Sequence, residues 1–189
     1  MTAPFKEMSA DEAAGFMRTK ESQRIRRVIA ERCEGGFVLD IGCGRGIQVK
    51  ELYPDWDMYF GIDCSPELIE LAERDNPDHN FEVLDVRLEK EYTYKRRDFA
   101  VLKSVLEHQE SIADAKHIYD LALQAADTVL VAWHTPPIYP RTEIITVNAC
   151  DLDRPLYQNH YKEGSFERED VSVQVERVEG FTLWTAVYH

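Results

Sequence analysis

Three glycines at alternate positions mark the segment of the chain most able to do chemistry. Gly42, Gly44 and Gly46 follow a short apolar run that carries one carboxylate, Asp40. Glycine lets the backbone adopt positive φ and lets a ligand approach closely, because no Cβ stands in the way. Residues 47–52 are typical of a helix start, so we expect backbone N–H groups of the loop to point at that ligand. The spacing therefore predicts a loop that binds a nucleotide-like cofactor.

Polar residues also close the apolar runs that we expect to be strands. The expected strands cover residues 38–41, 58–62, 81–84, 99–102 and 129–133, and the polar residues at their ends are Asp40, Asp63, Asp85, Lys103 with Ser104, and His134. Ligands of open α/β sheets bind over these carboxyl ends. Asp63 follows Gly42 by about 20 residues, an interval that suits a carboxylate accepting both hydroxyls of a ribose. The glycines lack the third position of the G-x-G-x-x-G fingerprint, which disfavours a nicotinamide dehydrogenase.

Helical periodicity alternates with these strands and completes an α/β pattern. Helices are expected from about residue 10, over 21–33, from 65 to 76 and over 111–126. Alternating apolar residues at 171–175 and 181–187 predict a closing β-hairpin, whereas the proline-rich residues 135–168 are irregular, with room for a short strand at 144–147. We therefore predict a Rossmann-like, doubly wound α/β fold: a mostly parallel seven-stranded sheet with a C-terminal antiparallel β-hairpin and helices on both faces.

Length and composition limit the number of domains and the kinds of partner. The 189 residues fit one globular unit, in which we expect a helical segment at 1–36 packed on a cofactor-binding domain at 37–189. With 22 basic and 35 acidic residues the net charge is −13, which repels phosphate backbones, so no nucleic acid is expected as a partner. No apolar run approaches the ~18 residues of a membrane span, and we expect no secretory signal. The 4 cysteines lack C-x-x-C and metal-ligand spacing, which favours reduced thiols and a cytoplasmic location.

Four segments of the chain resemble the motifs of a known family. They read VLDIGCGRG from residue 38, YFGIDCSPELIELA from residue 59, FEVLDV from residue 81 and DFAVLKSVLEH from residue 98. In this order and spacing they resemble the motifs of class I S-adenosylmethionine-dependent methyltransferases, over roughly residues 37–134. The resemblance implies that the chain binds S-adenosylmethionine and releases S-adenosylhomocysteine.

The resemblance also assigns residues to the methionine end of the cofactor. Its backbone wall would be formed by Gly42, Cys43, Gly44 and Gly46. Asp40 would lie near the amino group of the methionine part. Lys103 and Ser104 would end the fourth strand beside the sulfonium.

A second set of residues is implied for the adenosine end. Asp63 would hold the ribose hydroxyls, and Cys64 would lie against the adenine ring. Asp85 would accept a hydrogen bond from the adenine amino group, while the backbone N–H of Val86 serves a ring nitrogen. Capping of a turn or helix is the alternative for both aspartates, because Asp is common at such positions.

Three histidines are the candidates for a general base or for positioning the acceptor: His108, His134 and His160. A histidine suits proton transfer near neutral pH, although a helix-capping or substrate-lining role stays open for His108. Some relatives carry a carboxylate where this chain has Ser104, three residues before Glu107. Glu107 and His108 alone make a poor metal site, so no metal is expected.

The expected activity is methyl transfer to a small-molecule acceptor, with O-methylation the first hypothesis. A hydroxyl acceptor needs a base, whereas a carboxylate or thiolate acceptor does not. In this family the segment after the fifth strand often builds the acceptor pocket, and here it departs from the family pattern. The alternative is a catalytically silent module that binds the cofactor and scaffolds or regulates a partner. The sequence leaves the oligomeric state open.

Overall fold

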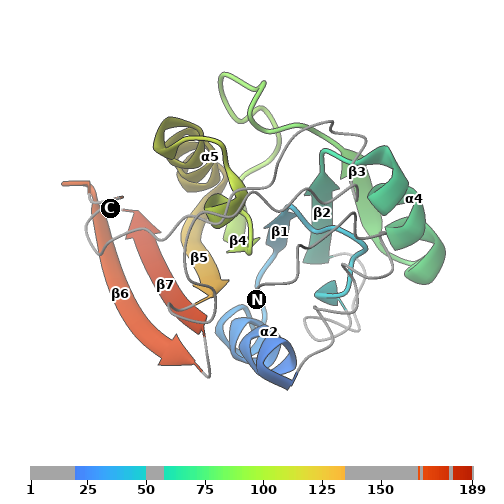
Figure 1. Ribbon diagram of the computed structural model, residues 1–189, viewed down its shortest axis with the longest axis horizontal. Coiled ribbons are helices and arrows are strands. Elements are labelled where there is room, and N and C mark those ends of the chain that lie inside the picture. The colour runs from blue at the N-terminus through green and yellow to red at the C-terminus, as the bar shows by residue number, and fades with distance from the viewer. Residues whose placement is uncertain (1–19, 50–57, 135–165, 167, 179–180, 189) are drawn as a thin grey trace, which may run out of the picture.

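The structure is a computed structural model that describes residues 20–49, 58–134, 166, 168–178 and 181–188. Its centre is a seven-stranded sheet with the order β3-β2-β1-β4-β5-β7-β6 (Figure 1). The strands are β1 (Val38–Ile41), β2 (Tyr59–Asp63), β3 (Asn80–Val83), β4 (Arg97–Lys103), β5 (Ala126–His134), β6 (Val171–Val178) and β7 (Phe181–Tyr188). Strands β1 to β5 run parallel, and β7 pairs antiparallel with both β5 and β6. The predicted fold class is confirmed, including the antiparallel hairpin.

Helices cover both faces of this sheet, as the sequence predicts. They are α2 (Lys20–Arg32), α4 (Pro66–Asp75), the short 3₁₀ helix η2 (Leu106–His108) and α5 (Ile112–Ala125). Side chains alternate along a strand, so neighbouring residues of β1 enter different cores. Val38 packs with the α2 residues Ile25 and Ile29, whereas Leu39 packs with the α5 residues around Tyr119. Figure 1 shows α2 and α5 on opposite sides of the sheet.

Helix starts follow the chemistry that the sequence offers. Ser65 caps α4 by accepting from the N–H of Leu68, and Pro66 occupies the first turn, where its missing N–H costs nothing. Ser111 caps α5 through the N–H of Asp114. The helix predicted from residue 10, the end of the one predicted at 47–52, and the possible strand at 144–147 lie outside the described residues. The division of the chain at residue 36 stays a prediction.

The connection from β3 to β4, residues 84–96, crosses the α5 side of the sheet and forms neither helix nor strand. We call it the strap. Tyr94 lies against Phe60 of β2 with ring centroids 5.9 Å apart, and Tyr92 packs on the core beneath α5. The tyrosines of the strap therefore cover this part of the sheet, where α/β folds usually place a crossover helix.

Polar contacts fasten the strap to α5. The carbonyl oxygen of Glu89 lies 2.7 Å from Nε2 of His117, and Arg96 donates to three carbonyl oxygens at the C-terminal end of the helix. Those carbonyls have no partner within the helix, so Arg96 satisfies them and places positive charge at the negative end of the helix dipole. These contacts fix the strap to α5 at Glu89 and at Arg96.

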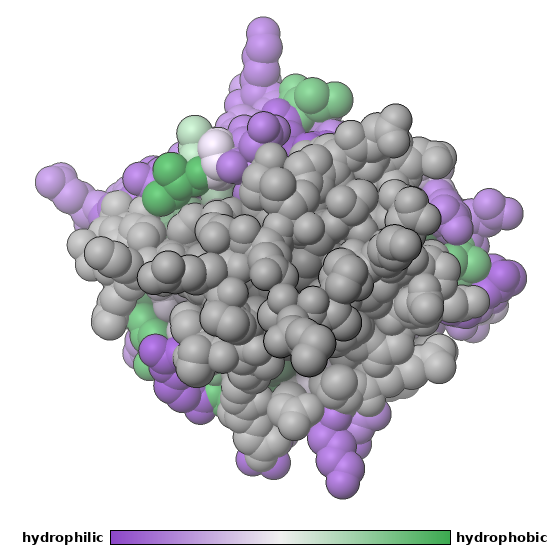
Figure 2. Space-filling view, viewed as in Figure 1, coloured by the Kyte–Doolittle hydropathy of each residue, from purple (hydrophilic) through white to green (hydrophobic). Residues whose placement is uncertain are grey.

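The surface differs sharply from these cores. On the face shown in Figure 2, the described residues that reach the solvent are mostly hydrophilic, with small hydrophobic areas between them. That is the ordinary pattern of a water-exposed face. No helix among the described residues is both long enough and apolar enough to cross a bilayer.

Candidate functional site

The glycine loop between β1 and β2 adopts the conformation that its sequence predicts. The φ angles are +72° at Gly42, +55° at Gly44 and +69° at Gly46. Two of the three glycines also lack room for a side chain. A Cβ on Gly42 would lie 2.6 Å from Cγ2 of Val105, and a Cβ on Gly46 would lie 2.9 Å from the ring of Phe81. Glycine is therefore required here by backbone conformation and by packing together.

The N–H groups of the loop are used inside the protein. Gly42 and Cys43 both donate to the carbonyl oxygen of Ile62, at 2.8 and 3.0 Å. Gly44 donates to the carboxylate of Asp63, and Gly46 donates to the carbonyl oxygen of Cys43. The expectation that the loop aims these N–H groups at a ligand is wrong for these four residues. The loop offers a wall without side chains, which suits an uncharged or cationic group better than a phosphate.

Asp63 is buried at the end of β2 and joins this loop to the next helix. Its Oδ2 accepts from the N–H of Gly44 and its Oδ1 from the N–H of Ser65, both at 2.9 Å. The turn-capping role that the sequence left open is therefore present. Burial raises the pKa of Asp63, and the two backbone hydrogen bonds oppose that rise. The side chain of Cys64 also forms a hydrogen bond to this carboxylate, so one of its roughly four acceptor positions remains for a ligand hydroxyl.

Asp40 lies on the α2 side of β1. Its carboxylate accepts a 2.7 Å hydrogen bond from the hydroxyl of Tyr59, and only 3% of the residue is exposed. Burial raises the pKa of Asp40 to about 6, against the opposing effects of the Tyr59 hydrogen bond and the charge of Lys103. The carboxyl group therefore loses its charge under mildly acidic conditions.

The end of β4 combines a half-buried cation, Lys103, with a strained residue, Ser104. The ammonium of Lys103 lies 5.5 Å from the centre of the Phe181 ring, and burial together with the charge of Arg26 lowers the pKa of Lys103 to about 8. Ser104 has a φ of 56°, the only positive value at a non-glycine residue in the part of the chain that the structure describes. Such strain persists at functional sites where the surroundings enforce it. The amide of Ser104 is fixed by donating to the carbonyl oxygen of Ala132 at 2.8 Å.

A cavity of about 60 Å³ opens over the carboxyl ends of β1, β2 and β3. Its lining contains five of the predicted cofactor residues: Gly42, Asp63, Cys64, Asp85 and Val86. The remaining lining residues were not singled out in the sequence: Ile41, Ile62, Leu84, Arg87, Val105, Gln109 and Ile118. Of the residues assigned to the methionine end, Gly42 lines the cavity, whereas the others, among them Asp40 and Lys103, do not. The structure thus brings the predicted adenosine residues together around one space.

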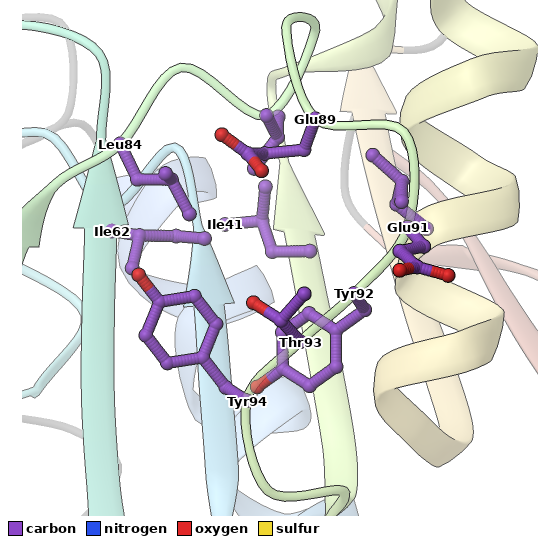
Figure 3. Close-up of a pocket in the computed structure, with 10 residues that line it drawn as sticks. Ile41, Ile62, Leu84, Glu89, Glu91, Tyr92, Thr93 and Tyr94 are labelled. Carbon is purple, nitrogen blue, oxygen red and sulfur yellow. The ribbon is translucent and has the colours of Figure 1, made fainter.

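A smaller apolar space continues this cavity beneath the strap. Ile41, Ile62 and Leu84 border both, and their side chains point toward Tyr92 and Tyr94 in Figure 3. At about 10 Å³ the space is too small for a ligand and is packing between the strap and the sheet. The floor of the cavity is therefore supported directly by the strap.

Arg87 is a lining residue of this cavity that the sequence reasoning missed. Its Nε donates to Oδ1 of Asp85 at 2.7 Å, its Nη2 donates to Oδ2, and its backbone N–H donates to Oδ1 at 3.2 Å. Asp85 therefore faces the cavity as one half of an ion pair. The signal was available in the sequence, because an arginine two residues after a carboxylate in a turn can reach back to it.

The three candidate histidines are unequally placed. His108 ends η2 and is half-buried, next to Glu107, a buried residue whose pKa is raised by burial against the charges of His108 and Lys103. His134 ends β5 opposite Phe181, and its side chain is not described. His160 lies outside the described residues. Within the described part of the chain no three His, Cys, Asp or Glu side chains form a metal-binding group.

Sheet order, glycine loop and acidic strand ends together define a class I S-adenosylmethionine-dependent methyltransferase. The chain belongs to the family described as "Methyltransferase domain", which matches residues 13–136. No curated protein matches the chain in sequence. The match to this family confirms the resemblance seen in the four sequence segments.

Solved structures share the fold at low sequence identity. An S-adenosylmethionine-bound amino pentose methyltransferase of calicheamicin biosynthesis, CalS10 from Micromonospora echinaspora, is 14% identical, with a TM-score of 0.72 over 96% of this chain and 98% of that one. The DhpI-SAM-HEP complex is 16% identical, with a TM-score of 0.71 over 94% and 91%. The glycopeptide N-methyltransferase MtfA, complexed with S-adenosylhomocysteine, is 14% identical, with a TM-score of 0.65 over 88% and 89%.

Proposed function

We propose that this protein transfers the methyl group of S-adenosylmethionine to a small-molecule acceptor, with an acceptor oxygen as the first hypothesis. The observation that carries the proposal is the cavity over the strand ends, where Gly42, Asp63, Asp85 and Val86 meet. Family membership supports methyl transfer itself. The chemistry of the acceptor rests on the arguments below.

The described residues suit this cofactor on three counts. Gly42 lines the cavity with backbone atoms alone, so no side chain of this residue keeps a ligand away from the loop. Two carboxylates at adjacent strand ends match the hydrogen-bond donors of a ribose and of an adenine amino group. The apolar residues between them, Ile41 and Ile62, suit the face of a purine ring. We infer that Asp63 holds the ribose and that Asp85 and Val86 hold the base.

The methionine end would lie toward the α2 side of the strand ends. Strand alternation directs Asp40 and Lys103 to that side, where each influences the pKa of the other. An ionised Asp40 there would attract the amino group of the cofactor. The wall of Gly42 to Gly46 would face the thioether carbons, since its N–H groups are already satisfied.

When bound, S-adenosylmethionine supplies a methyl group that is already activated by the sulfonium. The protein then has to hold the acceptor in line, with the reacting atoms about 3–3.5 Å apart. For a hydroxyl acceptor, a base must also remove its proton. His108 is the described candidate for that base, because it ends η2, the short helix that follows the strained Ser104 and Val105 at the end of β4.

A small-molecule acceptor is supported by charge and by the compared structures. The net charge of −13 disfavours a nucleic acid. Those solved structures include an amino pentose methyltransferase and a glycopeptide N-methyltransferase. Only the second of these names the methylated atom, a nitrogen, so the preference for oxygen rests on His108 alone.

Calorimetry and product release test the proposal in sequence. The protein is titrated with S-adenosylmethionine, S-adenosylhomocysteine and NAD, and only the first two are expected to bind. Release of S-adenosylhomocysteine is then measured over a panel of hydroxyl, carboxylate, amine and thiol acceptors. Binding of NAD alone would refute the proposal, and cofactor binding without turnover on any acceptor would favour the catalytically silent module. Turnover only on amines would refute O-methylation.

A further inference from the structure

The ion pair between Asp85 and Arg87 has a consequence for how the base of the cofactor is recognised. A carboxylate offers about four acceptor positions, two on each oxygen. Arg87 uses both positions on Oδ1, through Nε at 2.7 Å and through its own backbone N–H at 3.2 Å. Its Nη2 uses one position on Oδ2. A single acceptor position therefore remains, and it lies on Oδ2.

This pair differs from the ion pairs on the surface of the protein. The side chains of Arg87 and Asp85 are 20% and 22% exposed, whereas those of Arg32 and Glu176 are 44% and 39% exposed. Arg87 and Asp85 also both line the cavity, together with Cys64. A partly desolvated, two-pronged pair fixes geometry more firmly than an exposed contact does.

The charge of Arg87 is held in place by the same contact. Burial disfavours the charged guanidinium, but the hydrogen bonds and the charge of Asp85 outweigh it, and the pKa of Arg87 is raised. Asp114 adds a further favourable charge from the start of α5. Arg87 therefore stays a cation beside Asp85.

We propose that Arg87 is a positioning residue that sets the selectivity of the site for the 6-amino group of adenine. The fork of Arg87 holds the Asp85 carboxylate in one orientation, so its remaining Oδ2 position meets one N–H of that amino group. Without Arg87, the carboxylate would rotate and bind water instead, and the amino group would lose its fixed partner. The inference rests on the proposed role of Asp85 in binding the base.

Two ligands separate positioning from general support of the fold. They are S-adenosylhomocysteine and its analogue whose base lacks the 6-amino group, both titrated calorimetrically into the unmodified protein and its variants. A hydrogen bond to a charged group changes affinity by roughly ten-fold or more, so the unmodified protein should prefer the amino ligand by at least that factor. Arg87→Ala should weaken binding of the amino ligand and bring the preference below roughly three-fold.

Further variants distinguish the effect of the two-pronged geometry of Arg87 from the effect of its positive charge. Arg87→Lys keeps the charge but not the two-pronged geometry, so it should lose most of the preference as well. Asp85→Asn should lose it too, because the acceptor is no longer ionised. Arg32→Ala removes an exposed arginine–carboxylate pair that does not line the cavity, and it should leave the preference unchanged. Thermal unfolding of each variant confirms that it is folded at the temperature of titration.

Three results would overturn the inference. Equal weakening of both ligands by Arg87→Ala would make Arg87 a structural residue only. Tighter binding of S-adenosylhomocysteine to that variant would mean that Arg87 competes with the base for Asp85. An unmodified protein that binds both ligands equally would remove the amino contact altogether. Failure of the unmodified protein to bind either ligand would instead contradict the proposed cofactor function.

Discussion

Substituting Gly42 by alanine tests the glycine wall most directly. Two costs are expected, one from the backbone and one from packing. An alanine held near φ +72° costs about 1–2 kcal/mol relative to a right-handed conformation. Its Cβ would also meet Cγ2 of Val105 at 2.6 Å, and forced repacking of this kind costs about 1–3 kcal/mol. We expect the free energy of unfolding to fall by about 2–5 kcal/mol.

Gly35 supplies a matched control for the backbone cost. Its φ is +78°, close to that of Gly42, but a Cβ there would meet nothing within 4 Å. Gly35→Ala should therefore cost only the backbone contribution of about 1–2 kcal/mol. Urea unfolding followed by circular dichroism gives both values, and their difference isolates the contact between the loop and Val105.

Trimming Val105 completes the test. In the double variant Gly42→Ala with Val105→Ala, the contact at 2.6 Å is gone, so the two changes should be less damaging together than their separate costs imply. The coupling should be about 1–3 kcal/mol in favour of the double variant. If Gly42→Ala costs no more than Gly35→Ala, or if the two changes are simply additive, the packing argument for this glycine is refuted.

Three further outcomes follow from the site. Asp63→Ala removes the partner of two backbone N–H groups and the proposed ribose ligand, so calorimetry should show affinity for S-adenosylhomocysteine falling roughly 10–100-fold. Asp40 has a pKa of about 6 and is charged above that pH. The affinity for S-adenosylhomocysteine should therefore fall roughly ten-fold from pH 7 to pH 5, as Asp40 takes up a proton. Asp40→Asn should remove this dependence on pH. Ser104→Gly relieves a φ of 56° and should change stability by less than about 1 kcal/mol in urea unfolding, whereas Ser104→Val should destabilise by about 1–3 kcal/mol.

The fold was predictable because local signals agree along most of the chain. Ser65 and Pro66 begin α4 as their chemistry dictates, and apolar runs ending in polar residues give the parallel strands. Strand boundaries shift by a few residues, since β5 begins at Ala126 rather than 129. Hydrogen bonds extend a strand beyond its apolar residues wherever the neighbouring strand continues. The apolar pattern of the sequence does not show where a neighbouring strand ends, so it cannot give these boundaries.

The sequence predicted which residues lie at the strand ends, but it did not predict their hydrogen bonds or the directions of their side chains. Alternation along β1 could have shown that Asp40 points to the opposite face from Ile41, away from the cavity. The φ of Ser104 follows from pairing with β5 and has no local signal. The N–H groups of Gly42, Cys43 and Gly44 donate to Ile62 and Asp63, which lie about 20 residues away in sequence. Only the folded chain shows that these donors already have partners.

The hydrogen bonds that the N–H groups of the glycine loop make inside the protein have a consequence for inhibition by the product, S-adenosylhomocysteine. A wall without free donors at Gly42, Cys43, Gly44 and Gly46 makes no directional bond that depends on the charge of the sulfur. It would therefore bind the methylated and the demethylated cofactor about equally, and uniform binding of this kind does not speed the chemical step. S-adenosylhomocysteine should accordingly remain a competitor of fresh cofactor, and turnover would depend on how rapidly the spent molecule leaves or is removed by another enzyme.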